Sequence, residues 1–186
     1  MIVMLDTPTD LEECERELGV EHVEQLLTPL TRYKAQRPGD HFAVDNGAFS
    51  NFNSGYFRSL LARHFDRRTL CRFVAVPDVV GSARRTLEVF EFWKAELKDW
   101  PLALVCQNGQ EHHPIPWHEI TAIFIGGDTA WKIGPDAAAC IKAAKAIYVH
   151  ATLAAKEPKE AIIKKFKGKG KIFQLDEKRK AVVEGK

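Results

Sequence analysis

Short apolar runs that end in polar residues or in glycine recur along this chain, and no other feature constrains its fold as strongly. The clearest runs cover residues 41–44, 73–76, 102–106 and 122–125, and they lead into Asp45-Asn46-Gly47, Pro77-Asp78, Gln107-Asn108-Gly109 and Gly126-Gly127-Asp128. Such runs are typical of buried strands whose C-terminal ends turn out of the core. If the strands are parallel neighbours, their polar ends lie at one edge of the sheet, where a binding site can form.

Length and composition predict a single domain over residues 1–186. Hydrophobic residues make up 45% of the chain and charged residues 28%, which is ordinary for a globular domain with a sizeable core. No apolar run approaches the roughly 20 residues that a membrane helix needs, and residues 1–6 lack the basic start of a secretory signal. We therefore expect a cytoplasmic protein with no membrane contact.

The four cysteines give no sign of a metal site. Cys14, Cys71, Cys106 and Cys140 are widely separated, with no C-x-x-C pair and no Cys/His cluster at zinc spacing. Cys71 and Cys106 lie in apolar runs and are expected to be buried thiols. We expect neither a metal nor a cofactor.

Strand-like and helix-like segments alternate along the chain. The predicted strands cover residues 1–5, 41–44, 70–76, 102–106, 122–125, 147–150 and 171–175. The predicted helices cover residues 10–18, 21–27, 54–64, 83–98, 135–146 and 158–167. Asn53 or Ser54 is the expected cap of one of these helices and Ser82 that of another, and Pro135 suits the first turn of a third.

This alternation predicts an α/β fold built from parallel βα units. With most polar residues at the strand ends, the favoured architecture is a small or incomplete TIM-like (β/α)8 barrel, whose site lies at the C-terminal ends of the strands. A doubly wound open sheet is the alternative, although no G-x-G-x-x-G or P-loop sequence follows any strand.

The polar strand ends supply the candidate site residues. Asp45 and Asp78 are carboxylates that can accept N–H bonds or transfer a proton, and Gln107 carries both a donor and an acceptor. Gly126 and Gly127 would let a flat ligand approach the backbone. Each residue also has a structural interpretation, as a loop brace or a tight turn. Together they predict a pocket for a planar, hydrogen-bonding base.

Four further residues are weaker candidates for contact with such a base. Asn46 follows Asp45 directly, and His150 ends a predicted strand. Phe49 and Trp131 are aromatic residues that could stack on the ligand as a lid. Aromatic side chains and single histidines are more often structural, which is the competing interpretation.

The charge of the chain is unevenly distributed. Residues 156–186 carry 11 Lys and Arg against 5 Asp and Glu, a net charge of +6, whereas the rest of the chain carries −4. A basic segment of this kind can bind nucleic acid, and a solvated lysine-rich tail is the competing interpretation.

The motifs resemble those of the tRNA-guanine transglycosylase superfamily, and more closely its small branch of phage and genomic-island DNA-guanine transglycosylases. These enzymes exchange guanine in DNA for a 7-deazaguanine. The resemblance covers about residues 27–150 and depends on LTPLTRY at 27–33, DNGAFS at 45–50, FVAVPDVVG at 73–81, VCQNGQ at 105–110 and FIGGDTAWK at 124–132.

The resemblance implies a TIM-like barrel and a role for each motif residue. It makes Asp45 a base-contacting acid/base residue, Asp78 the second base-reading aspartate, and Gln107, Gly126 and Gly127 the groups that complete the reading of the base. The nucleophile of such enzymes is a later aspartate that attacks C1′ of the sugar, and Asp176 is the candidate. The sequence after His150 departs from the family pattern, so the residues next to Asp176 are atypical for the nucleophile of this family.

The implied partners are DNA, with tRNA as the alternative, and a free 7-deazaguanine base. Lys171, Lys178, Arg179 and Lys180 are the expected phosphate contacts beside Asp176. A phage-encoded enzyme of this kind would act in the host cytoplasm.

Two other functions stay open. One is a relative that binds a deazaguanine or removes a base without replacing it. The other is a small-molecule barrel enzyme such as an aldolase-like lyase, which would need a Schiff-base lysine, for which Lys132 is the candidate, or a metal at a strand end.

Overall fold

The computed structural model describes residues 2–5, 11–30, 37, 39–144, 148–152 and 172–175. Its strands are β1 (Ile2–Leu5), β2 (Val23–Leu27), β3 (Phe42–Val44), β4 (Cys71–Ala75), β5 (Leu102–Cys106), β6 (Ala122–Ile125), β7 (Tyr148–Thr152) and β8 (Ile172–Leu175). Its helices are α1 (Leu11–Leu18), α2 (Ala48–Asn51), α3 (Ser54–Arg63), α4 (Ala83–Glu96), α5 (Thr129–Ile133) and α6 (Pro135–Ala143), with short 3-10 turns at Phe65–Leu70 and Gln110–His112.

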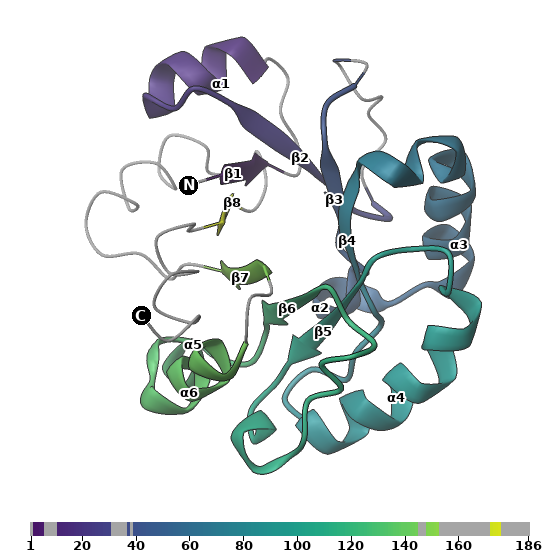
Figure 1. Cartoon of the computed structure of the whole chain (residues 1–186), viewed down its shortest axis with the longest axis vertical. Coiled ribbons are helices and arrows are strands. Elements are labelled where there is room, and N and C mark those ends of the chain that lie inside the picture. The colour runs from purple at the N-terminus through teal and green to yellow at the C-terminus, as the bar shows by residue number, and fades with distance from the viewer. Residues whose placement is uncertain are drawn as a thin grey trace.

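The strands form a curled sheet in chain order (Figure 1). Each strand from β1 to β6 is parallel to the next, and β7 pairs parallel with β6. Strand β8 runs antiparallel to both β7 and β1, and its two pairings close the ring. The predicted α/β class with a curled parallel sheet is confirmed, whereas the reversed direction of β8 departs from an all-parallel eight-stranded barrel.

The prediction of a helix over residues 21–27 was wrong, because this segment contains strand β2. Val23, Leu26 and Leu27 recur at helical spacing, and the acidic Glu24 reads as a solvent-facing residue. In the structure all five residues of β2 are buried. Glu24 is only 1% exposed because its carboxylate pairs with the Arg72 guanidinium of β4. The partner that allows this burial lies 48 residues away.

An irregularity in β4 brings Arg72 to this pair. The register between β3 and β4 shifts between the pairs Phe42–Cys71 and Val44–Val74. An extra residue on one strand re-aims the side chains beside it. The Arg72 Nη2 atom lies 2.6 Å from Oε1 of Glu24, and its Nε atom lies 3.0 Å from Oε2.

Capping residues start the two main outer helices where the sequence predicts them. The Asn53 Oδ1 atom accepts a hydrogen bond from Tyr56 N at 3.0 Å at the start of α3. The Ser82 side chain accepts one from Arg85 N at 3.5 Å at the start of α4. Helix α6 begins at Pro135, as expected. The predicted helix over residues 158–167 lies outside the described residues.

The core has two layers. Inside the curled sheet, alternate strand residues pack together, among them Met4, Leu26, Phe73 and Phe124. A larger cluster fills the space between the sheet and helices α3 and α4, with Phe57 and Phe90 fully buried. Figure 1 shows these helices on the outer side of strands β3 to β5. The outer layer holds the strands so that their C-terminal ends stay together.

Within the described part of the chain, no helix combines the length and apolar character that crossing a membrane requires.

Candidate functional site

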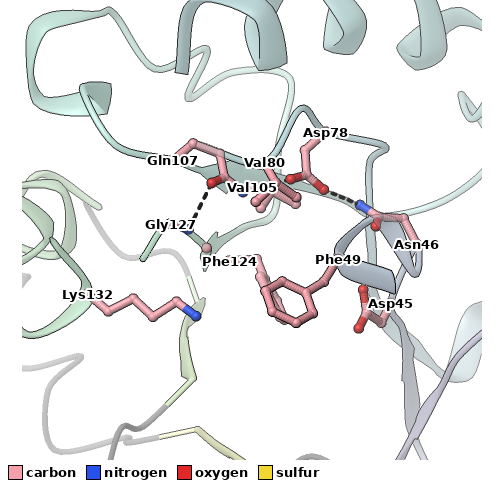
Figure 2. A pocket seen from close by; sticks show the side chains of 11 residues that line it. Asp45, Asn46, Phe49, Asp78, Val80, Val105, Gln107, Phe124, Gly127 and Lys132 are labelled. Carbon is pink, nitrogen blue, oxygen red and sulfur yellow. Dashed lines mark hydrogen bonds between the residues drawn. The ribbon is translucent and has the colours of Figure 1, made fainter. Parts of the chain in front are cut away.

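A pocket of about 200 Å³ opens at the C-terminal ends of strands β3 to β6 (Figure 2). It is lined by Asp45, Asn46, Phe49, Asp78, Val80, Val105, Gln107, Phe124, Gly126, Gly127 and Lys132. A cavity of the order of 150 Å³ can hold benzene, so this pocket accommodates a small ring system. The structure thus brings together the polar strand ends that the sequence singles out.

Asp45 lies directly after β3 and lines this pocket. Its backbone N–H donates to Leu27 O at 2.8 Å, which continues the β2–β3 pairing by one residue. Its carboxylate accepts a hydrogen bond from Gly47 N at 3.2 Å. Gly47 has a φ of +76°, a left-handed conformation that glycine adopts without steric cost. The turn at Gly47 therefore fixes a carboxylate that is only 7% exposed.

Asn46 lines the pocket and also braces the loop that carries Asp78. Its Nδ2 atom donates to Val76 O at 2.9 Å and to Asp78 Oδ1 at 2.8 Å. Its Oδ1 atom accepts a hydrogen bond from Ala48 N at 2.7 Å. An amide has two N–H donors, and both are used within the protein. These bonds form a bridge from β3 to the loop after β4, so the expected contact of Asn46 with a base could use only its Oδ1 atom.

Gln107 also orients Asp78. Its Nε2 atom donates to Asp78 Oδ2 at 2.7 Å. Its Oε1 atom accepts from Gly81 N at 2.8 Å and from Gly127 N at 2.9 Å, so both acceptor positions of the oxygen are filled. We expected Gln107 to offer a ligand both a donor and an acceptor, whereas the structure leaves it at most one N–H.

Asp78 is consequently held from two sides. One carboxylate oxygen accepts a bond from Asn46 and the other accepts a bond from Gln107. A carboxylate has about four acceptor positions, so two amide bonds fix its orientation without exhausting its capacity. Figure 2 shows this carboxylate at the upper wall of the pocket. Asp78 is thereby preorganised to receive N–H groups from a ligand.

Gly126 and Gly127 leave no room for side chains. A Cβ atom on Gly126 would lie 2.5 Å from Gln107 Nε2 and 2.8 Å from Val105 Cγ1. Gly127 has a φ of +75°, and a Cβ atom there would lie 2.7 Å from Asn108 Oδ1. The N–H groups of both glycines are engaged, by Cys106 O and by Gln107 Oε1. These backbone bonds limit the pair to carbonyl contacts with a ligand.

The two aromatic candidates occupy different positions. Phe49 lies on α2, is 73% exposed and lines the pocket, as a stacking residue should. Trp131 is buried, and its Nε1 atom donates to Glu111 Oε2 at 3.0 Å. It is not part of the pocket lining, so the expected stacking role of Trp131 does not fit this geometry.

Helix α5 brings an unexpected cation into the pocket wall. Asp128 caps this helix by accepting from Trp131 N at 2.9 Å, and this bond is the main reason why the pKa of Asp128 lies below its ordinary value. Lys132 follows one turn later and lines the pocket. From the sequence we considered Lys132 only as a Schiff-base lysine. The signal that could have placed it is its i, i+4 spacing from the helix cap.

Several predicted residues cannot be placed in the site. His150 is described only as part of β7, where it pairs with Phe124 of β6 and Leu175 of β8. Asp176, Lys171, Lys178, Arg179 and Lys180 lie outside the described residues. Leu175, the last residue of β8, pairs with Ile2 at the N-terminal end of β1, which is the edge opposite the pocket.

Within the residues that the structure describes, no group of three or more His, Cys, Asp or Glu side chains is arranged to hold a metal ion. Comparison with protein families, with curated proteins and with solved structures finds no match to this chain. The functional conclusion therefore depends on the sequence motifs and on the chemistry of the pocket.

Proposed function

We propose that this chain binds a guanine-type base in the pocket and exchanges guanine in DNA, or alternatively in tRNA, for a 7-deazaguanine on a TIM-like barrel. The observation that carries the proposal is Asp78, a carboxylate held by the amides of Asn46 and Gln107 at 2.8 and 2.7 Å. The reaction is inferred from the motif resemblance, and the recognition of a guanine-type base is inferred from the polar groups of the pocket.

The polar groups of the pocket favour a ligand that is rich in donors. Asp45 and Asp78 are acceptors when ionised, and Gly126 and Gly127 have only their carbonyls left for a ligand. The N1–H and N2–H₂ groups of guanine form a donor edge of this kind, whereas the matching edge of adenine contains a ring acceptor. A guanine-type base is therefore the better partner for Asp78.

Apolar residues complete the pocket for a flat ring. Phe49 and Val80 line it and are 73% and 50% exposed, so a bound ring would cover them. Val105 and Phe124 line it from the buried side. Stacking of a base on an aromatic side chain is worth about 1–3 kcal/mol and does not depend on sequence context. A base flipped out of the nucleic-acid double helix could stack on the apolar residues of the pocket and form hydrogen bonds with its polar residues.

We assign the chemistry to Asp45 and a later aspartate. The nucleophilic carboxylate forms a bond to C1′ while the bond from C1′ to the guanine nitrogen breaks, and the departing base takes the electron pair and a proton. Asp45 lines the pocket and is the proposed proton donor, and it recovers the proton from the incoming base in the reverse step. Asp176 remains our candidate nucleophile, with Lys171, Lys178, Arg179 and Lys180 as phosphate contacts.

The register of β8 favours a second candidate function. Because Leu175 pairs with Ile2 at the opposite edge from the pocket, the strand that leads to Asp176 does not run toward Asp45. A relative that binds a deazaguanine, or that removes a base without replacing it, needs the pocket but not this nucleophile. This alternative shares the recognition chemistry and differs in the products.

An exchange assay separates these possibilities. The purified chain is incubated with guanine-labelled DNA and with a separately labelled 7-deazaguanine, and both labels are followed. Exchange predicts release of guanine together with stoichiometric incorporation of the second label, with both lost in Asp45→Asn and kept in Asp99→Asn, an exposed control. Release without incorporation supports the second candidate, and binding of the free base without release supports a pure binder.

A covalent intermediate provides an independent readout. Denaturing gels of the wild-type reaction should show a protein–DNA adduct that disappears in Asp176→Asn. An adduct that survives this substitution assigns the nucleophile to another residue. A protein that neither binds a guanine-type base nor releases guanine contradicts the proposed function.

A further inference from the structure

The side chain of Lys132 lies across the pocket from the carboxylate of Asp78, the group proposed to bind the donor edge of the base. Figure 2 shows its side chain extending from α5, with the ammonium group directed into the pocket on the side opposite Asp78 and Asn46. Asp45 lies on the same side as Asn46 in this view. The pocket therefore has an acidic side and a basic side.

This charge separation orients any guanine-type base that enters. If the N1–H and N2–H₂ edge faces Asp78, the five-membered ring points to the opposite wall, because that ring lies across the molecule from the donor edge. The substituent that distinguishes one 7-deazaguanine from another is attached to this ring. In that orientation the substituent would face the wall that contains Lys132, the cationic side chain of the pocket lining.

We propose that Lys132 determines which 7-deazaguanine the pocket accepts, an inference that rests on the proposed function. An ammonium group has three donors and no acceptor, so it favours a substituent that is anionic or carries acceptor atoms, such as a carboxylate or a nitrile. It disfavours a cationic aminomethyl substituent through like-charge repulsion. The favoured substrates are thus acidic or neutral 7-deazaguanines.

The backbone that carries Lys132 is fixed in place. Asp128 and Asn108 are joined by two hydrogen bonds, from Asn108 Nδ2 to Asp128 Oδ2 at 2.7 Å and from Asp128 N to Asn108 Oδ1 at 3.0 Å. Trp131, the neighbour of Lys132, is buried and bonds to Glu111. Because this turn is already anchored, only the side chain of Lys132, and not its backbone, has to be ordered when the ammonium group contacts a ligand, which favours selectivity.

Titration calorimetry with free bases tests this inference. The ligands are four 7-deazaguanines that carry hydrogen, nitrile, carboxylate or aminomethyl at position 7. The proteins are the wild type, Lys132→Met, Lys132→Glu and Lys142→Met, where Lys142 is an exposed lysine of α6 outside the pocket lining. Circular dichroism and thermal unfolding confirm that each variant is folded.

We expect the wild type and Lys142→Met to bind the carboxylate about tenfold to a hundredfold more tightly than the aminomethyl base, the range of one charged hydrogen bond. Lys132→Met should reduce this ratio to within about threefold, and Lys132→Glu should reverse the preference. The unsubstituted base should bind all four proteins with similar affinity, because it has no substituent for Lys132 to meet.

Binding of the unsubstituted base distinguishes failure of the inference about Lys132 from failure of the proposed function. If it binds to the wild type but the ranking of the other bases is unchanged in Lys132→Met and Lys132→Glu, the role of Lys132 is overturned and the base pocket stands. If no base of the series binds the folded wild type, the proposed function fails and the inference fails with it.

Discussion

Gln107 and Asp78 are joined by a hydrogen bond of 2.7 Å from Nε2 to Oδ2, which ties the end of β5 to the loop after β4. The oxygen of the same amide holds Gly81 N in that loop and Gly127 N after β6. One buried side chain therefore connects three strand ends. Asn46 adds the fourth through its bond to the other oxygen of Asp78.

Replacing Gln107 with leucine should damage the pocket more than the fold. Leucine has a similar volume but leaves Gly81 N and Gly127 N without their partner and releases Asp78. Gly81 is exposed and Gly127 half-buried, and a typical hydrogen bond contributes about 0.5–1.5 kcal/mol, so we expect the free energy of unfolding to fall by about 1–3 kcal/mol, together with weaker base binding. Urea unfolding and calorimetry measure the two effects. Unchanged values for both would show that the amide is dispensable.

Replacing Asp78 with alanine should abolish discrimination for guanine-type bases. The substitution removes a charged acceptor for ligand N–H groups, worth on the order of 1.5–3 kcal/mol of binding free energy. Calorimetry with guanine and adenine checks this, with Asp99→Ala as the exposed control. An Asp78→Ala protein that still prefers guanine as strongly as the wild type would assign Asp78 a purely structural role.

Introducing a methyl group at Gly126 should block the pocket. The new Cβ atom would lie 2.5 Å from Gln107 Nε2 and 2.8 Å from Val105 Cγ1, so both neighbours must shift. Overpacking of this kind costs about 1–3 kcal/mol of stability. We expect Gly126→Ala to unfold at lower urea concentration and to lose base binding. Gly55→Ala, in the first turn of α3, is the matched control: its Cβ atom would lie 3.3 Å from Asn53 Oδ1, so only a small shift of that side chain is needed, and base binding should be unchanged.

Removing the carboxylate of Glu24 should be strongly destabilising. Glu24 is 1% exposed and pairs at 2.6 Å with Arg72, whose side chain is 23% exposed, so Glu24→Ala removes this partner from a half-buried guanidinium. Breaking a fully buried pair costs about 3–5 kcal/mol, and because Arg72 keeps some contact with water we expect about 2–3 kcal/mol here.

The matched control for this pair is Glu96→Ala, which breaks the exposed pair with Arg58 and should change the urea midpoint little. Equal effects of the two substitutions would contradict the assignment of Glu24 and Arg72 as a buried pair that stabilises the sheet.

His64 should make stability depend on pH. Burial, with Arg67 and Arg63 nearby, lowers its pKa below the ordinary value of 6.5. The unfolded chain therefore binds a proton at a higher pH than the folded chain does. The contribution of His64 is fully present above about pH 6.5 and is lost as the pH falls toward the folded pKa.

Urea unfolding of the wild type and His64→Gln between pH 5 and 8 tests this dependence. The loss of stability below about pH 6.5 should be smaller in the variant, whereas the exposed His118→Gln should behave as the wild type. A variant with the same pH profile as the wild type would remove His64 as the cause.

Local sequence signals accounted for much of the fold and for the location of the pocket. The runs before Asp45, Asp78 and Gln107 predicted strands β3, β4 and β5, because a buried strand needs continuous apolar residues and its polar neighbours mark its end. Asn53 and Ser82 predicted the starts of α3 and α4, because a capping side chain bonds to N–H groups only two or three residues away. These properties depend on nearby residues alone.

Long-range partners determined the rest. Glu24 could belong to a buried strand only because Arg72 reaches it from β4, and the sequence around Glu24 contains no trace of that partner. The direction of β8 depends on its pairing with β1, at the other end of the described chain.

Long-range partners also determine which strand-end residues face a ligand and which hold the loops in place. Asn46 and Gln107 are amides at strand ends, as a base-reading residue would be. Most of their hydrogen-bonding capacity is taken up by Asp78, Gly81 and Gly127, which are 20 to 32 residues away in the sequence. Trp131 and Lys132 are adjacent in sequence, and packing against Glu111 turned the aromatic residue away from the pocket and left the cation in its wall. Residue type and spacing indicated which chemistry was available, and three-dimensional packing determined which side chains can present it to a ligand.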